Sequence, residues 1–212
     1  MKNVLTILSL IMIVSCKKEN LKTTKKKSSE DSIINKSISI NRIDSIETID
    51  DIKKEYANIN NLLTLKKLDS SQFSYNCDER EGEVTLYYRD KKLAAVKDFY
   101  AEHSHFSSST TYFVKNDRVF FIFNDETVWN FDEGGTPEKP ETKDDIKEKR
   151  IYILDNKAVQ CFEKNYSIRS KGNNKNPENI SNQKTKCTAT EFIKRYELIL
   201  KNKDTKGEIQ CL

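Results

Sequence analysis

The sequence predicts an α+β fold, in which an antiparallel β-sheet of hairpins forms a meander flanked by an N-terminal and a C-terminal helix. Apolar residues recur every three to four positions near residues 45–68 and again near 188–200, which indicates amphipathic helices. Between these segments, three aromatic-rich stretches are each divided by a short polar turn, which indicates hairpins. Because each helix has one apolar stripe, we expect both helices to cover the same face of the sheet.

The first 16 residues, MKNVLTILSLIMIVSC, have the order of a bacterial export signal. Lys2 precedes an apolar run over 4–14, which is shorter than the ~20 residues of a permanent membrane-spanning helix. The run ends in IVSC at 13–16, which resembles the lipobox of bacterial lipoproteins, whose Cys carries diacylglycerol. We therefore expect residues 1–15 to be a cleaved signal peptide and Cys16 to be lipidated. The alternative is an ordinary signal or an uncleaved anchor with an accidental cysteine.

Residues 16–44 are expected to form the lipidated cysteine and a disordered tether. This stretch is rich in Lys, Ser, Asn and Thr and has no sustained apolar period, although SISI at 37–40 leaves an edge strand as an alternative. It carries eight basic and four acidic residues, and the signal adds one lysine. Of the total charge of +4, about −1 is therefore left for the domain over 45–212. Since nucleic-acid binding needs positive charge on the domain, we expect no nucleic-acid partner. The basic tether suits anionic lipid head groups.

The two expected helices open and close the domain. The first has seven apolar residues at helical spacing: Ile46, Ile49, Ile52, Tyr56, Ile59, Leu62 and Leu63. Its end is open, because 62–68 reads either as its last turns or as a separate piece. The second follows Thr188-Ala-Thr-Glu191, which predicts a capping box. Its apolar face consists of Phe192, Ile193, Tyr196, Ile199 and Leu200.

Three hairpins are expected at 86–96, 112–123 and 152–162, with turns at Asp90-Lys91, Asn116-Asp117 and Asn156-Lys157. Asn and Asp tolerate the positive φ that tight hairpin turns require. The stretch DEGGTPEKPETKDD at 132–145 is too polar for a core and contains glycine and proline, so we expect a solvent-exposed loop. A second polar segment, 170–186, precedes the C-terminal helix.

Four cysteines remain after Cys16: Cys77, Cys161, Cys187 and Cys211. An even number in an exported chain favours disulfides, and four cysteines allow three pairings. We favour Cys161–Cys187, because this bond would close a polar loop of 26 residues and attach the last helix to the sheet. Cys77 and Cys211 are then paired or free. No two of the four have the CxxC spacing of a zinc site.

Candidate chemistry is sparse. His103 and His105 would share one face of a strand and are the weak candidates for a metal site, with Asp98 and Glu102 as further ligands. The alternative is a polar shoulder of a hairpin. No glycine-rich phosphate loop and no nucleophile elbow occurs, so we expect no catalytic residues, no enzymatic activity and no cofactor.

Aromatic residues gather near the middle of the chain: Phe120, Phe121, Phe123, Trp129 and Phe131. Exposed on a sheet, such residues can bind sugars or a partner protein. The alternative, which we favour, is that they form the buried face of the sheet.

The lipobox, SYNCDE (74–79), TYFVKNDRVFFIF (111–123), VWNFD (128–132) and RIYILDNKAVQCFEK (150–164) together resemble a group of uncharacterised lipoproteins common in the Bacteroidota. This resemblance implies an envelope location and an antiparallel-sheet fold, and it transfers no activity. In that group an acidic run after the cysteine is associated with surface export. The letters KKE at 17–19 match this run poorly, which leaves periplasmic and outward orientations open.

The functional expectation is a lipid-anchored protein of the bacterial cell envelope, in the outer membrane, that binds a protein or a glycan without catalysis. The N-terminal lipid would hold it to the membrane. One alternative is an immunity or inhibitor lipoprotein that neutralises an exported toxin or hydrolase, with the 132–145 segment as an exposed acidic or aromatic plug. A metal-dependent enzyme around His103 and His105 is a further alternative.

Overall fold

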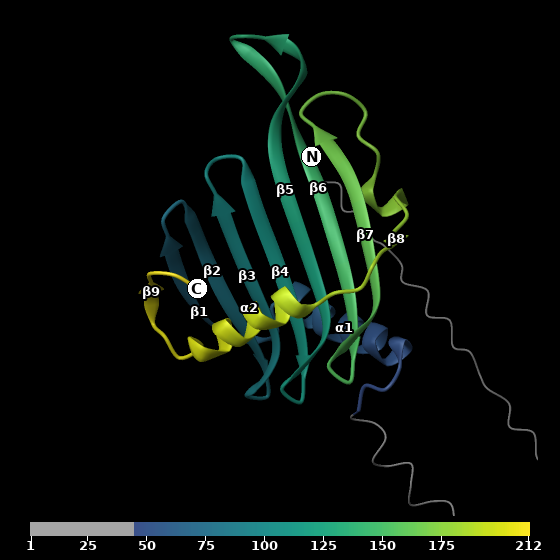
Figure 1. Cartoon of the computed structure of the whole chain (residues 1–212), viewed down its shortest axis with the longest axis vertical. Helices are drawn as coiled ribbons and strands as arrows, with labels where there is room; N and C mark the ends of the chain where they lie inside the picture. Colours follow the sequence, from purple (N-terminus) through teal and green to yellow (C-terminus); the bar gives the residue numbers. More distant parts are fainter. Residues whose placement is uncertain (1–44) are drawn as a thin grey trace, which may run out of the picture. The chain divides into compact units, whose positions relative to one another are not determined.

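The computed structural model describes residues 45–212, all of which belong to one compact unit. The export signal, Cys16 and the tether at 16–44 lie outside the described residues. The helices are α1 (Ile49–Thr64), α2 (Thr190–Lys201) and a short 3-10 helix, η1 (Pro177–Asn179). The strands are β1 (Asp69–Cys77), β2 (Arg80–Arg89), β3 (Lys92–Glu102), β4 (Phe106–Lys115), β5 (Arg118–Thr136), β6 (Lys139–Leu154), β7 (Lys157–Arg169), β8 (Gln183–Lys184) and β9 (Gly207–Ile209). They form one sheet in the order β8-β7-β6-β5-β4-β3-β2-β1-β9 (Figure 1).

The predicted fold class, an α+β antiparallel meander of hairpins flanked by two helices, is wrong. The described residues form one large mixed sheet of nine strands with only two α-helices. The sheet is mixed because β9 pairs in parallel with β1, through Phe73–Gly207 and Tyr75–Ile209. The sequence pattern missed this pairing because β9 is three residues long and has no apolar alternation of its own.

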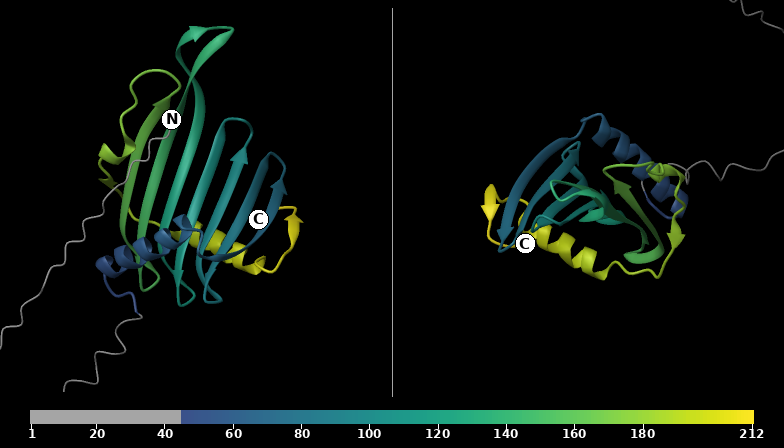
Figure 2. Two further views of the ribbon diagram at one scale, coloured as in Figure 1. Left: turned by 180° about the vertical axis from the view of Figure 1, so that it is seen from behind. Right: turned by 90° about the horizontal axis from the view of Figure 1, so that it is seen from above.

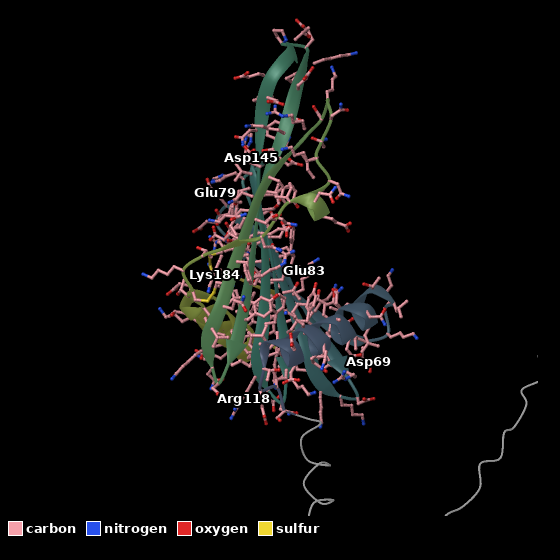
Figure 3. All side chains as sticks on the ribbon, turned by 90° about the vertical axis from the view of Figure 1, so that its right-hand side faces the viewer. Asp69, Glu79, Glu83, Arg118, Asp145 and Lys184 are labelled. Atoms are coloured by element: carbon pink, nitrogen blue, oxygen red, sulfur yellow. A yellow bond between two sulfur atoms is a disulfide. The ribbon has the colours of Figure 1, made fainter. Side chains whose placement is uncertain are left out.

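The two helices lie on opposite faces of the sheet and not on one face, as Figure 2 shows from above and Figure 3 shows edge-on. Neighbouring residues of β4 demonstrate this, because Tyr112 belongs to the core under α2 and Phe113 to the core under α1. The apolar stripe of a helix requires a sheet face to cover it, but it does not specify which face. With aromatic residues on both sides of β4 and β5, both faces need a cover.

Each face therefore has its own core. The core under α2 consists of Phe73, Tyr75, Val84, Leu86, Val96, Tyr112, Val114, Val119, Ile122, Ile151, Ile153 and Cys161 from the sheet with Tyr196 and Ile199 from α2. The core under α1 consists of Ala94, Ala95, Phe113, Phe120 and Phe121 from the sheet with Ile52 and Ile59 from α1. Most members of both cores lie in the half of the sheet near the three two-residue turns, where Figure 3 labels Arg118.

The turns of the three expected hairpins have both central residues at positive φ, as a tight hairpin turn requires. These residues are Asp90 and Lys91, Asn116 and Asp117, and Asp155 and Asn156. The third turn therefore lies one residue earlier than the sequence suggested. The expected loop at 132–145 is wrong as well, because β5 and β6 continue through it as one long hairpin that projects beyond the other strands (Figure 1). The residues of this segment are polar because no core packs against this part of the hairpin.

The helix caps also differ from expectation. The predicted capping box at Thr188–Glu191 is absent, since the N-cap of α2 is Ala189 and no side chain caps it. A capping box does begin α1, where Thr48 and Asp51 exchange hydrogen bonds with each other's backbone N–H.

Two disulfides are present among the described residues. Cys161–Cys187 joins β7 to the segment before α2, which is the bond expected from the sequence. Cys77–Cys211 joins the end of β1 to the residues after β9. Within 45–212, neither helix has the length and hydropathy that a membrane span needs.

Candidate functional site

The face of the sheet that α2 crosses changes from apolar to polar beyond the helix. Strand pairing sets the residues of this face in rows, because residues opposite one another on paired strands point the same way. One row contains Asp98, Thr110 and Asn124, and the next contains Tyr100, Ser108 and Glu126. Of these six residues, Asp98, Ser108, Thr110 and Asn124 are buried. Polar side chains buried at the edge of an apolar core indicate a built site, since burying them is costly unless they are bonded.

Asp98 joins the sheet to α2. Its carboxylate accepts hydrogen bonds of 2.8 Å from the hydroxyl of Tyr75 and 2.8 Å from Nε of Arg195. Asp98 is 3% exposed, so this ion pair is largely removed from water. Arg195 also donates from Nη1 to the main-chain oxygen of Leu212, and its guanidinium lies 4.9 Å from the centre of the Tyr75 ring. The group therefore connects β3, β1, α2 and the C-terminal segment.

A glycine makes room for one member of this group. Gly82 lies opposite Tyr75, and a Cβ at position 82 would fall 2.1 Å from the Tyr75 ring. The Tyr75 ring thus lies against the β2 backbone at position 82, where any residue larger than glycine would collide with it.

A second group, on β4 and β5, is bonded only in part. The side-chain NH₂ of Asn124 lies 3.1 Å from the hydroxyls of both Ser108 and Thr110. The other end of the amide, Oδ1, is buried without a hydrogen-bond partner, and so is the hydroxyl of Tyr112. Asn124 is 1% exposed and Tyr112 is 0% exposed. Each such group costs about 1–3 kcal/mol when left unpaired. Both groups lie on the α2 face, on the adjacent strands β4 and β5.

These residues line a recess of about 180 Å³ between the sheet and the first turn of α2. Arg80 and Tyr100 form part of its wall on the sheet side, and Glu191 and Phe192 form the helix side. A larger hollow of about 430 Å³ adjoins it over β4–β7, and the two share Glu126 in their walls. Both hollows lie on the part of the α2 face that the helix does not cover, and together we call them the α2-face groove.

The tyrosines in and beside the groove keep their protons at neutral pH and act as hydrogen-bond donors. Burial, reinforced by the nearby negative charge of Asp98, raises the pKa of both Tyr75 and Tyr112 above the usual value of 10. Burial likewise raises the pKa of Tyr100. The groove therefore offers neutral hydroxyl groups, and no tyrosinate forms there near pH 7.

The two candidate metal-binding histidines do not come together on a strand. His103 to His105 form the turn between β3 and β4, where His103 has a φ of 51°. Nε2 of His103 lies 2.8 Å from Glu79, whereas the His105 ring lies 4.9 Å from the Trp129 ring. Asp98, proposed as a further ligand, is bound to Arg195. Over residues 45–212, no three metal-ligating side chains cluster.

The aromatic cluster is divided along β5. Phe120 and Phe121 are buried in the core under α1, as favoured from the sequence. Further along the strand, Trp129 and Phe131 contact each other at 5.0 Å, and Phe131 is 63% exposed. The same strand thus supplies core near the turns and exposed aromatic surface on the projecting hairpin.

Comparison with protein-family models, with curated proteins and with solved structures found no match. The groove itself was missed from the sequence, although one signal was present. In FSSSTT at 106–111, alternate polar residues sit beside Asp98 and Asn124 once the hairpin turns fix the register. Arg195 gave no signal, because it is 97 residues from its partner Asp98.

Proposed function

We propose that this chain is a lipid-anchored cell-envelope protein whose domain is a non-enzymatic binding module, with the α2-face groove as its ligand surface. The observation that carries the proposal is the pair of unpaired buried polar groups beside the recess, on Tyr112 and Asn124. Natural folds leave few such groups, and each calls for an explanation. A ligand that bonds to them would recover the free energy that they cost the unliganded fold.

The anchor part of the proposal rests on the N-terminal pattern, in which a short apolar run ends at Cys16. The resemblance to Bacteroidota lipoproteins supports an envelope location. The domain, with a charge of about −1, has no basic surplus that would favour a nucleic-acid partner.

Site-specific photo-crosslinking tests the binding face. The photoreactive residue p-benzoylphenylalanine replaces Glu126, which borders both hollows, in the full chain expressed in its native envelope. The matched control places it at Lys97, an exposed residue on the opposite face of β3. We expect a discrete cross-linked product from position 126 and none from position 97. Products from both positions alike, or from 97 alone, would refute the assignment of the face.

A second candidate, an inhibitor or immunity lipoprotein, is favoured by the projecting β5–β6 hairpin. Over 131–145 this hairpin has six acidic and two basic residues, and it exposes Phe131. An exposed aromatic residue surrounded by acidic residues could insert into the basic active site of a toxin or hydrolase and block it. Replacing 131–142 by a two-residue Asn-Gly turn removes Phe131 and most of the acidic residues, and it should abolish protection of cells against a co-expressed toxin while the cross-link from position 126 persists. Unchanged protection would exclude the hairpin as the inhibitory element.

A further inference from the structure

We propose that the recess beside α2 binds one ring of a neutral carbohydrate, with the Tyr112 hydroxyl and the Asn124 amide oxygen as its recognition groups. The inference deepens the proposed function and rests on it. It names the class of ligand and the residues that select it.

The charges of the recess argue for a neutral ligand. Every charged side chain in its wall already has an opposite partner. Arg195 pairs with Asp98, Arg80 with Glu102, Glu126 with Lys149, and Glu191 with Lys194. No charge is left over to bind a phosphate, a carboxylate or an ammonium group, and breaking a largely buried pair such as Asp98–Arg195 would be costly.

The unpaired groups argue for hydroxyls. Oδ1 of Asn124 only accepts, whereas the Tyr112 hydroxyl donates and accepts. A sugar hydroxyl also does both, so neighbouring hydroxyls of one ring can satisfy the two groups. Ser108 and Thr110 supply two further hydroxyls beside Asn124. Tyr100 and Phe192 add aromatic surface, on which the apolar face of a sugar ring can pack.

The shape argues against an extended peptide. Peptides that bind in extended form pair their N–H and C=O groups with the free edge of a sheet. The recess lies on the face of β3, β4 and β5, whose main-chain groups are already paired with neighbouring strands. Its volume of about 180 Å³ is below the ~300 Å³ of drug-sized pockets, which fits a single ring. The adjoining hollow of about 430 Å³ has room for the next rings of an oligosaccharide.

Access requires a side chain to rotate, since both unpaired oxygens are screened from bulk solvent. Glu191, in the wall of the recess, has a side chain that is 82% exposed, and it pairs with Lys194 of the same helix.

Glycan binding by the full chain in detergent micelles tests the inference. The probes are immobilised neutral trisaccharides of glucose, mannose, galactose and N-acetylglucosamine, with heparin as the anionic control. The tightest neutral ligand is then titrated by calorimetry. Ser108→Ala should weaken binding about tenfold and Tyr112→Phe by a similar factor, since each removes one hydrogen-bonding group. Ser109→Ala, the next residue on the opposite face, should change affinity less than twofold.

The outcomes separate the inference from the proposed function. Binding of a neutral trisaccharide that Ser108→Ala weakens and Ser109→Ala does not supports the inference. Equal effects of the two variants, or preferred binding of heparin, overturns it. If no glycan binds and position 126 still cross-links to a protein, the carbohydrate inference fails and the binding face stands. If neither occurs, both fail.

Discussion

Asp98 is the residue on which the polar half of the α2 face depends. It holds Tyr75 of β1 and Arg195 of α2 at 2.8 Å each, and it is nearly inaccessible to water. Arg195 itself is partly buried, with a side chain that is 18% exposed. Removing the carboxylate charge would therefore leave a guanidinium without compensation in a poorly solvated place.

Asp98→Asn is accordingly expected to lower the free energy of unfolding by about 3–5 kcal/mol. Asp69→Asn, at an exposed aspartate on β1, serves as the control and should change it by less than about 0.5 kcal/mol. Chemical denaturation of the full chain in micelles measures both. Equal effects would show that the buried ion pair is not a stabilising contact.

The carboxyl of Glu148 gives a pH-dependent prediction on the face under α1. Burial opposes its ionisation, but hydrogen bonds from Tyr166, Lys164 and Arg150 outweigh burial and hold its pKa below the usual 4.5. Because the folded-state pKa of this carboxyl is lower than its unfolded-state pKa, ionised Glu148 stabilises the fold at any pH above the unfolded-state pKa. This stabilisation disappears as the pH falls through the folded-state pKa.

Glu148→Gln should therefore be less stable than the parent chain at pH 7, and the difference should shrink as the pH falls below about 4.5. The matched control is Glu163→Gln on the opposite face, whose partner Lys147 lies 3.6 Å away in a more exposed pair. Urea denaturation across pH 3–7 gives the measurement. A difference that stays constant over this range would contradict the account.

At the scale of elements, the three tight hairpin turns were predictable from the sequence, but the long β5–β6 hairpin and the start of α2 were not. Each of the three tight hairpins has an Asn or Asp at its turn, because these residues tolerate positive φ better than most others. Composition misled at 132–145, since a hairpin without a core beneath it is as polar as a loop. The capping motif before α2 misled as well, because the N-cap of α2 is Ala189, one residue after Thr188, so Glu191 is not at the position that a capping box needs.

The candidate site was invisible for a related reason. Its members come from β1, β3, β4, β5 and α2, and no local pattern links them. Asp98 and Arg195 meet because α2 packs across the face of the sheet that carries Asp98. The sequence suggested that both helices cover one face, so it did not show which strand residues lie beneath α2. The site was therefore missed for the same reason as the arrangement of the helices.

The two disulfides should stabilise different elements. By chain entropy alone, loops of 26 and 134 residues correspond to about 3.5 and about 5 kcal/mol. The double variant Cys77→Ser/Cys211→Ser should speed hydrogen exchange in β1 and β9. The variant Cys161→Ser/Cys187→Ser should do so in β7, β8 and the start of α2. Exchange that rises evenly over the whole sheet in both variants would contradict this division.

At the scale of the whole molecule, the proposal joins an anchor to a binding domain. If Cys16 carries the lipid, Cys16→Ala should move the protein from the membrane fraction to the soluble fraction, because the acyl chains supply the membrane affinity. Metabolic labelling with a tagged fatty acid should mark the parent chain and not the variant. Lys17→Ala is the control and should remain membrane-bound. A Cys16→Ala protein that stays in the membrane fraction would refute the anchor.

The central claim is that the α2-face groove keeps buried polar groups unpaired for a ligand, and the thermal stability of ligand-free Tyr112→Phe tests it most directly. The Tyr112 hydroxyl is buried without a partner, so its removal should leave the Tm of the unliganded protein unchanged or raise it. Tyr75→Phe is the control, since its hydroxyl is bonded to Asp98, and its Tm should fall. A clear drop in Tm for Tyr112→Phe would show that this hydroxyl already has a structural partner, and it would contradict the claim.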